Sequence, residues 1–402
     1  MSESVDSPGS AEGALHGLRV LELGHGVAGP FAARLLADLG AEVIKVEPPG
    51  GDFSRRLAPF ATDDEGVRTS LLHTYLNWNK RGTVLDLAAS GAAERLKPLV
   101  VWADIVIESF RPGRLARWGF GFDLLTQWRP GLVLTSVSNF GQFGPRSQDL
   151  ASDLIFYALS GLSSISGFAD PDPPIKHGLR QSLYGAGMTA AYSALAGHRL
   201  ARLTGAAQHV DVSIHECVAS EMVTPWSFYS FAGAVQGRHP RRADPLDGLP
   251  LRAAEGFVAF QLNDRAPISS LAQLIGDPDL ADPRWMVDEF RVRHAHQLRA
   301  SLEAGLARRP AVDWFVEASE RGVLAGLVQG AEELLSCAQL RSRQALRPVP
   351  RQSSIRFPAE LARLTRTSAT VRTPAPYLGE HDEQIVALSR SLGAAAPAAA
   401  PG

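Results

Sequence analysis

The stretch LRVLELGHGVAGPFAARLLADLGAEVIKVE, residues 18–47, decides the fold class. An apolar run at 18–23 is followed by a glycine-rich turn, an amphipathic segment at 31–40 and a second apolar run at 41–47. Pro30 suits the first turn of a helix, because an N–H group has no helical partner there. The order predicts a strand, a turn, a helix and a parallel strand, which together form one βαβ unit.

The same alternation continues along the chain. Apolar runs at 83–87, 103–110 and 132–138 are typical of strands, and segments 92–102 and 122–128 between them have helical spacing. Strands that alternate with helices predict an α/β fold with a parallel, doubly wound sheet. Beyond residue 226, a long polar loop, an apolar run at 256–262 and several amphipathic segments indicate a second, smaller domain.

Composition and charge argue against several classes of function. The formal net charge is -2 and the pI is about 6.6, so nothing favours nucleic acid or an anionic membrane as a partner. Cys217 and Cys337 match no metal-ligand spacing, and we expect neither a disulfide scaffold nor a metal site. Without a signal sequence or a long apolar run, we expect a cytoplasmic protein. Residues 1–14 and 393–402 are expected to be disordered tails.

The first turn has two interpretations. Gly24, Gly26 and Gly29 satisfy G-x-G-x-x-G between a strand and a helix, and Glu47 ends the next strand. In dinucleotide-binding proteins such glycines admit a pyrophosphate to the helix start, while the acid binds a ribose hydroxyl. The alternative is a tight βα turn whose glycines serve only packing.

A second segment with two glycines is RQSLYGAGMTAAYSALAGHRLARLTG, residues 180–205. It predicts a turn at Gly185 and Gly187 that leads into a long helix. Turns of this kind can hold a nucleophile, because glycine lets other groups approach the backbone. The two residues before the first glycine are Leu183 and Tyr184, and neither is a carboxylic acid.

Five motifs, in order along the chain, resemble CoA-transferase family III, which includes formyl-CoA transferase, carnitine CoA-transferase and α-methylacyl-CoA racemase. They are LNWNKRGTVLDL, ESFRPGRLARWGF, SNFGQFGP, LARLTGAAQHVDVSIHE and APYLGEHDE, within residues 15–392. The resemblance implies a large Rossmann-like domain at 15–222 and 347–392, an inserted α+β domain at 223–346, and an interlocked, ring-like dimer. Coenzyme A or an acyl-CoA is then the substrate, without a metal. The resemblance displaces the nicotinamide interpretation, because the family uses no hydride carrier.

The resemblance also implies where coenzyme A binds. The candidate residues come from the first turn, the N-x-N-K segment and the loop after the strand at 103–110: Val27, Ala28, Asn77, Asn79, Lys80, Phe110, Arg111 and Arg117. Backbone N–H groups and guanidinium groups suit phosphates. The alternatives are exposed charges for the two arginines and a turn cap for the second asparagine. A basic residue that often follows the K-V-E strand is replaced by Pro48, although Arg55 and Arg56 follow nearby.

One catalytic residue of the family is missing. In the transferases that the chain resembles, an aspartate two residues before the first glycine of the second segment attacks the thioester. A mixed anhydride and then an aspartyl-CoA thioester form. Aligning backwards from Gly205 without a gap puts Leu183 at that position. The nearest acids, Asp170 and Asp172, lie in the preceding loop, and the family's glycine run is absent from 241–256.

We therefore predict a catalytically silent subunit of a heteromeric CoA-transferase, paired with a paralogue that keeps the aspartate. The resemblance extends to succinyl-CoA:benzylsuccinate CoA-transferase, built from two different family III chains. By this analogy succinyl-CoA is the expected donor, and an acid like benzylsuccinate is the expected acceptor.

Two alternatives remain. A racemase-like enzyme would remove a proton α to the thioester, and His25, His177 and His198 are candidate bases. A homodimeric protein could instead bind acyl-CoA without catalysis. If the site is kept, Leu183, Tyr184, Phe140 and Phe143 predict an apolar surrounding; core packing is their alternative role.

Overall fold

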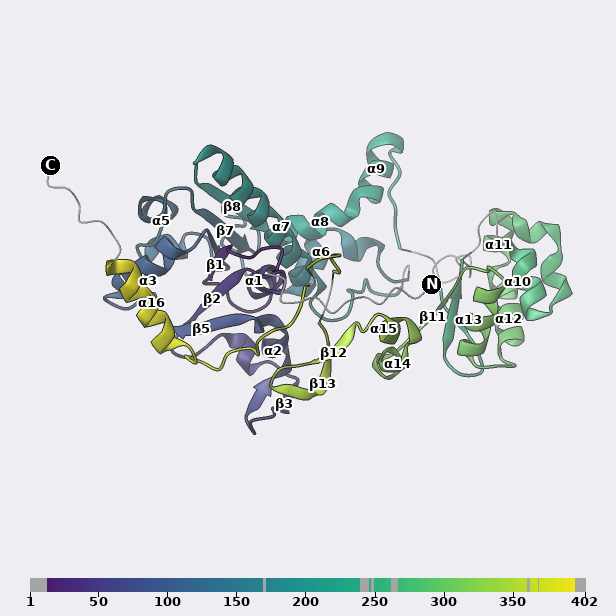
Figure 1. Ribbon diagram of the computed structural model, residues 1–402. Helices are drawn as coiled ribbons and strands as arrows, with labels where there is room; N and C mark the ends of the chain where they lie inside the picture. The colour runs from purple at the N-terminus through teal and green to yellow at the C-terminus, as the bar shows by residue number, and fades with distance from the viewer. Residues whose placement is uncertain are drawn as a thin grey trace. The chain divides into compact units, whose positions relative to one another are not determined.

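The computed structural model describes residues 13–168, 171–238, 246, 249–261, 267–359, 362–367 and 369–394. Both expected tails lie outside the described residues, apart from 13–14 and 393–394. The chain forms two compact units (Figure 1): 1–163, 176–233 and 342–402 make the larger, and 164–175 with 234–341 the smaller. The sequence-based boundaries were 222/223 and 346/347. The first division falls later, after residue 233, because α8 (Ile214–Ala219), η3 (Ser220–Met222) and α9 (Val223–Ala232) follow one another without a break. The second division falls earlier, after residue 341.

The larger unit is built on a six-stranded sheet in the order β5-β2-β1-β6-β7-β8, in which every neighbouring pair is parallel. The strands are β1 (Arg19–Glu22), β2 (Glu42–Glu47), β5 (Lys80–Val84), β6 (Ile105–Glu108), β7 (Val133–Ser138) and β8 (Gln208–Ser213). This confirms the predicted α/β fold with a parallel sheet. The chain adds strands on one side of β1 and then on the other, so the loops after β1 and β6 diverge. Ligands of open α/β sheets bind in the crevice at such a point.

The third strand lies earlier than its apolar pattern predicted. The sequence indicated 83–87, whereas β5 covers Lys80–Val84. Lys80 and Arg81 lie beside Val43 and Ile44 of β2 in the ladder. Pairing with the buried strand β2 therefore sets the register of β5. The apolar residues Leu85 and Leu87 lie beyond the end of the strand and pack into the hydrophobic core.

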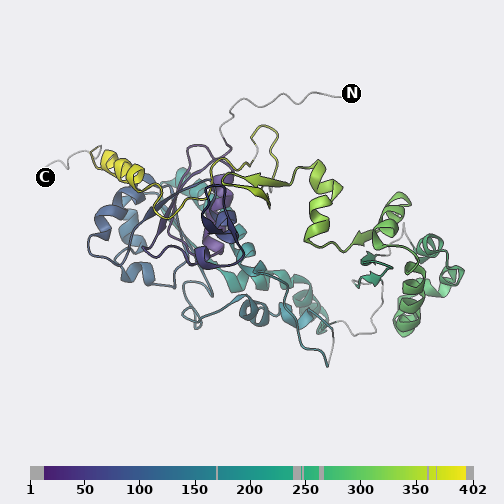
Figure 2. The ribbon, with the colours of Figure 1, turned by 90° about the horizontal axis from the view of Figure 1, so that it is seen from below.

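Helices cover both faces of the sheet (Figures 1 and 2). On one face α3 (Ala92–Trp102), α5 (Phe122–Trp128) and α16 (Asp382–Ala394) share a core with Leu21 and Leu134. On the other face α1 (Ala28–Asp38) packs against α7 (Gln181–Thr204). A Cβ atom on Gly197 of α7 would lie 3.2 Å from the Val133 side chain. Val133 and Leu134, successive residues of β7, thus point to opposite faces of the sheet. The helix α16 belongs to the larger unit, as the sequence indicated.

The smaller unit has its own apolar core. A three-stranded antiparallel sheet, β11-β10-β9, consists of Ala325–Leu327, Phe257–Phe260 and Leu251–Arg252. The helices α10 (Ile268–Ile275), α12 (Ala295–Leu306) and α13 (Ala311–Glu320) contribute the rest of its core. Leu271, Leu298 and Leu302 are completely buried. Strand and helix segments predicted from 256–321 are thus present in an α+β unit. Over the described ranges, no helix combines the length and apolar character needed to cross a membrane.

Candidate functional site

A cavity of about 290 Å³ lies where the loops after β1 and β6 diverge. We call it the carboxyl-edge cavity, because it lies at the carboxyl ends of the strands. Its walls come from the loops after β1, β6 and β7, from α6 (Asp153–Leu159) and from the start of α7. Residues that line it include His25, Val27, Ala28, Phe110, Arg111, Ser138, Asp153, Phe156 and Leu183. Segments distant in sequence therefore form one concave site of the kind that binds small molecules.

The first turn is tied to the loop after β6. The His25 N–H donates to Ser109 Oγ at 2.8 Å, and that hydroxyl donates back to the His25 carbonyl at 3.2 Å. A Cβ atom on Gly24 would lie 3.3 Å from Gly29 Cα, so the two ends of the turn approach closely. Glycine at both positions permits this contact. The turn is thereby held across the point where the strand order reverses.

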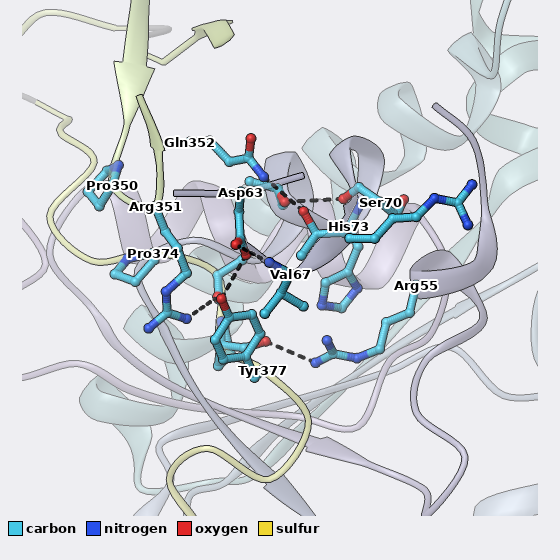
Figure 3. Close-up of a pocket in the computed structure, with 15 residues that line it drawn as sticks. Arg55, Asp63, Val67, Ser70, His73, Pro350, Arg351, Gln352, Pro374 and Tyr377 are labelled. Carbon is cyan, nitrogen blue, oxygen red and sulfur yellow. Dashed lines mark hydrogen bonds between the residues drawn. The ribbon is translucent and has the colours of Figure 1, made fainter. Parts of the chain in front are cut away.

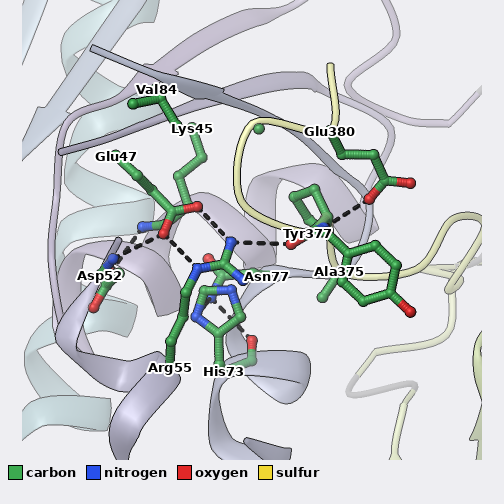
Figure 4. A network of polar contacts seen from close by, with 12 residues as sticks. Lys45, Glu47, Asp52, Arg55, His73, Asn77, Val84, Ala375, Tyr377 and Glu380 are labelled. Carbon is green, nitrogen blue, oxygen red and sulfur yellow. Dashed lines mark hydrogen bonds and ion pairs between the residues drawn. The ribbon is translucent and has the colours of Figure 1, made fainter. Parts of the chain in front are cut away.

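A buried ion network lies beneath this turn, and Figure 4 shows two of its members, Lys45 and Asp52. Lys45 Nζ lies 2.7 Å from Glu22 Oε1 and 3.0 Å from Asp52 Oδ2, and it donates to the Gly24 carbonyl at 3.1 Å. The three charged side chains have no exposed surface. Burial alone would lower the pKa of Lys45, but Glu22 and Asp52 raise it above its usual value. Burial likewise opposes ionisation of Asp52, yet Lys45 and the Ser54 N–H hold its pKa far below the usual range.

The geometry does not fit the dinucleotide interpretation. The Gly26 N–H, which would face a pyrophosphate, donates to Asp52 Oδ1 at 3.0 Å. The Glu47 carboxylate, the expected ribose ligand, binds Arg55 through two hydrogen bonds of 2.7 and 2.6 Å. A phosphate at this turn would meet a buried carboxylate in place of a free donor. In this chain the glycines serve the packing of the turn.

The N-x-N-K residues lie outside the carboxyl-edge cavity. Lys80 Nζ donates to Glu22 Oε2 at 2.6 Å and to Asn77 Oδ1 at 2.9 Å, and Lys80 is 2% exposed. Asn79 donates to Asp38 Oδ1 at 2.8 Å and accepts the backbone N–H groups of Arg372 and Thr373. These side chains hold the fold together beneath the first turn. A direct contact with coenzyme A, which stays a prediction, would need the Lys80 ion pair to open.

Four of the other candidates come together in the cavity. Val27 caps α1 and Ala28 begins it, and Phe110 and Arg111 follow β6 on the opposite wall. The Phe110 ring lies 5.3 Å from the His25 ring. Arg117 ends α4 (Arg114–Arg117) and is not part of the cavity wall. Binding of coenzyme A by all five of these residues stays a prediction.

The predicted turn before the long helix is wrong. Gly185 and Gly187 lie inside α7, which begins at Gln181. A Cβ atom on Gly187 would lie 2.8 Å from the Ala28 carbonyl oxygen and 3.0 Å from the Phe31 ring. The glycine therefore permits close packing of α7 on α1, whereas no described atom approaches a Cβ on Gly185 within 4 Å. A helix can contain glycine at such a contact despite the unfavourable propensity.

Leu183 occupies the third position of α7 and lines the carboxyl-edge cavity. It packs against an apolar cluster that contains Val27, Phe31 and Leu76. Tyr184 turns to the same cluster, where its ring meets the Phe31 ring edge-on at 4.9 Å. The side chain that the sequence placed at the family's nucleophile position is thus beside the first turn, and it is apolar.

Two carboxylates line the cavity, and both have partners. Asp153 Oδ1 accepts the N–H and the hydroxyl of Ser182 at 3.2 and 2.5 Å, and Lys176 Nζ lies 3.1 Å from Oδ2. Asp149 pairs with Arg146 at 3.1 Å on the surface. The first carboxylate binds the N-terminal end of α7, next to Leu183, and so fixes where the helix begins.

The candidate histidines are widely separated. His25 lines the cavity, and burial followed by the Lys45 charge lowers the pKa of its ring. His177 contacts the Tyr157 ring, and His198 lies on α7 near Asp104, where burial lowers its pKa. Only the first of the three thus meets the geometric requirement for a base in this cavity.

The expected apolar surrounding is present in part. Phe140 is buried beside Phe156, whereas Phe143 is 82% exposed and reaches no cavity wall. Sequence reasoning missed Phe156, Asp153 and the Glu22–Lys45–Asp52 network. Charged residues inside otherwise apolar strands were the available signal for the network, because a buried charge needs a partner.

The described residues contain no group of three or more histidine, cysteine, aspartate or glutamate side chains that could hold a metal ion.

Comparison with known proteins places the chain in a family. Residues 15–382 match CoA-transferase family III. Succinyl-CoA--D-citramalate CoA-transferase of Chloroflexus aurantiacus is 34% identical over 378 residues, with 92% of each chain covered. The succinyl-CoA--L-malate CoA-transferase beta subunit of the same organism is 26% identical, covering 92% of this chain and 93% of that protein. A CAIB/BAIF family protein from Brucella suis has a TM-score of 0.86 at 27% identity, covering 94% of this chain and 100% of that one. The chain therefore belongs to CoA-transferase family III.

Proposed function

We propose that this chain is the catalytically silent subunit of a heteromeric CoA-transferase. The complex moves coenzyme A from an acyl-CoA to a carboxylic acid, and a paralogous subunit supplies the nucleophilic aspartate. One observation carries the proposal: Leu183, at the expected nucleophile position, is an apolar residue on the wall of the carboxyl-edge cavity. Leucine has no oxygen that could attack a thioester.

The other acids of the cavity do not replace the missing aspartate. Asp153 binds Ser182 through one oxygen and Lys176 through the other, so its attack on a thioester would break both interactions at the start of α7. Asp149 is 46% exposed and pairs with Arg146. Neither carboxylate is both unengaged and next to the first turn.

The names of the relatives support the substrate class. Two of them act with succinyl-CoA, and the second is named as a beta subunit. We propose succinyl-CoA as the donor and a dicarboxylic acid, such as one of the benzylsuccinate type, as the acceptor. The coarser assignment, coenzyme A transfer between carboxylic acids, rests on membership of the family.

Assembly with a partner chain is supported by α9. None of its side chains is buried, and Trp226, Phe228, Tyr229 and Phe231 are at least half exposed. An apolar patch of this kind is rare on monomeric proteins and marks an interaction surface. We propose that the paralogous subunit covers it, in the interlocked arrangement that the family resemblance implies.

The test compares the chain alone, its Leu183→Asp variant and its complex with a paralogue that has aspartate at the corresponding position. Transfer of coenzyme A from succinyl-CoA is measured, and hydroxylamine traps any enzyme-bound thioester. We expect activity only in the mixture, with the trap on the paralogue, and a gain of trapped thioester in Leu183→Asp but not in Leu183→Asn. Turnover by the unmodified chain alone would contradict the proposal.

A second candidate is a proton transfer α to a thioester with His25 as the base. Its support is the position of His25 on the cavity wall, with a lowered pKa that keeps the ring neutral near pH 7. Deuterium incorporation into an α-methylacyl-CoA in heavy water, lost in His25→Gln, would establish this function. Absence of exchange would leave the transferase assignment.

A further inference from the structure

A second cavity, of about 170 Å³, lies in the larger unit away from the carboxyl-edge cavity (Figure 3). Its walls come from the hairpin of β3 (Phe60–Thr62) and β4 (Arg68–Ser70), from α2 (Leu71–Asn77) and from segments 350–352 and 374–377. We call it the hairpin cavity. It shares no lining residue with the first cavity.

His73 presents an unpaired donor to the hairpin cavity. Asn77 Oδ1 accepts from Lys80 Nζ, which can only donate, so the Asn77 amide nitrogen must be the atom 3.2 Å from His73 Nδ1. Nδ1 therefore accepts, and it also meets Ser54 Oγ at 2.8 Å. The ring proton is on Nε2, which has no partner among the described residues although His73 is 5% exposed. Burial and the nearby Arg55 charge lower the pKa of His73 to about 3, so the ring stays neutral.

The other free groups of the wall are also mainly donors. Arg55 uses Nε and Nη2 to bind Glu47 and the Pro376 carbonyl, and its Nη1 binds none of the described residues. Arg68 stacks over the Phe60 ring at 4.3 Å and has no acidic partner in the described chain. The Gln352 carbonyl oxygen is the buried acceptor of this wall that lacks a partner. Buried polar groups normally have partners, so this excess of donors indicates an acceptor-rich occupant.

One acid of the wall limits the charge of that occupant. Asp63 is 7% exposed, and it accepts the Tyr377 hydroxyl at 2.7 Å and the Val67 N–H at 2.8 Å. A dianion such as phosphate would meet this carboxylate and would have to lose a strongly bound hydration shell. A singly charged ligand avoids both costs. The Val67 side chain, Pro376 and the Tyr377 ring offer an apolar surface beside the donors.

We propose that the hairpin cavity binds a short-chain monocarboxylate. The carboxylate oxygens accept the His73 Nε2–H and an Arg55 N–H, and Arg68 adds a favourable charge at the rim. The hydrocarbon part lies against Val67, Pro376 and the Tyr377 ring. A hydroxyl group on the ligand would satisfy the Gln352 oxygen. The inference does not depend on the proposed function, because no residue of the carboxyl-edge cavity takes part.

The experiment titrates the full-length, ¹⁵N-labelled chain with sodium butyrate at constant ionic strength. The ring Nε2–H signal of His73 is followed by NMR, and the affinity is measured by calorimetry. Butyramide, which has a similar shape without the charge, and inorganic phosphate are the comparison ligands. The variants are His73→Phe and Arg68→Gln, and Arg111→Ala in the carboxyl-edge cavity is the matched control.

We expect saturable binding of one butyrate with a shift of the His73 signal. Loss of one hydrogen bond to a charged ligand predicts about tenfold weaker binding in His73→Phe, and the exposed Arg68 contributes about threefold. Arg111→Ala should bind butyrate unchanged. If His73→Phe does not fold, the wild-type signal and Arg68→Gln decide the question. Unsaturable binding, equal affinity for butyramide, tighter binding of phosphate, or weakening by Arg111→Ala would each overturn the proposal.

Discussion

Replacing Lys45 by methionine tests whether the buried ion network supports the fold. The substitution keeps a chain of similar length but removes the charge that lies within 3.0 Å of both Glu22 and Asp52. Breaking a buried ion pair by removing one partner costs about 3–5 kcal/mol. Glu22 keeps Lys80 at 2.6 Å, and Asp52 keeps the Gly26 and Ser54 N–H groups. We therefore expect Lys45→Met to lower the free energy of unfolding by about 3 kcal/mol, the lower end of this range.

The measurement is the free energy of unfolding in urea at pH 7.5, extrapolated to water. Lys45→Met is compared with Asp52→Asn and with the double variant. Because the charges contact each other, the double variant should be less destabilised than the sum of the single variants, with a coupling of about 1–3 kcal/mol. A loss below about 1 kcal/mol in Lys45→Met, or additive single effects, would refute the reasoning.

Three further predictions follow from single positions. Gly187→Ala should lower the free energy of unfolding by about 1–3 kcal/mol, because its Cβ would meet a backbone oxygen at 2.8 Å. Gly185→Ala should raise it by about 0.5–1 kcal/mol in the same urea assay. Equal effects of the two substitutions would contradict the packing argument. Burial raises the pKa of Glu108 from 4.5 to about 7, so the folded state holds an extra proton between these values and stability falls as the pH rises through that window. Glu108→Gln should therefore be more stable than the unmodified chain by about 2–3 kcal/mol at pH 8, but not at pH 4.5. A difference in stability that did not depend on pH would show that the Glu108 carboxyl does not cause the loss of stability at high pH. Arg111→Ala should weaken coenzyme A binding by about threefold, and Arg117→Ala by less, since Arg117 lies off the cavity wall; calorimetry that ranked them in reverse order would count against the first cavity as the coenzyme site.

Several features of the chain could be read from local sequence. The alternation of strands and helices at 18–47 and 92–138 predicted a parallel α/β sheet, because period and length of the apolar runs distinguish the two element types. The identity of the family followed from motifs at matching order, and the comparison of 15–382 agrees with it. The sequence also shows directly that residue 183 is a leucine and not a carboxylic acid.

Local sequence misled where long-range packing decided the outcome. Gly185 and Gly187 resembled a turn, but the contact of Gly187 with α1 explains a glycine inside a helix. The strand β5 shifted to begin at Lys80 because it pairs with β2. The polar atoms of the N-x-N-K side chains are bonded within the fold, which local sequence did not indicate, and their contact with the coenzyme stays a prediction.

The sequence by itself thus determined the element types, the family and the absence of an acid at position 183. Only the tertiary structure showed that Leu183, His25 and Arg111 share one cavity, since these residues come from three separate segments. It also showed that the Asp52 carboxylate accepts a hydrogen bond from the Gly26 N–H, and that no described residue is a partner for His73 Nε2. The physical reason is that the spacing of apolar residues, which predicts helices and strands, depends on neighbours in sequence. The partners of a buried polar atom depend instead on contacts between distant segments.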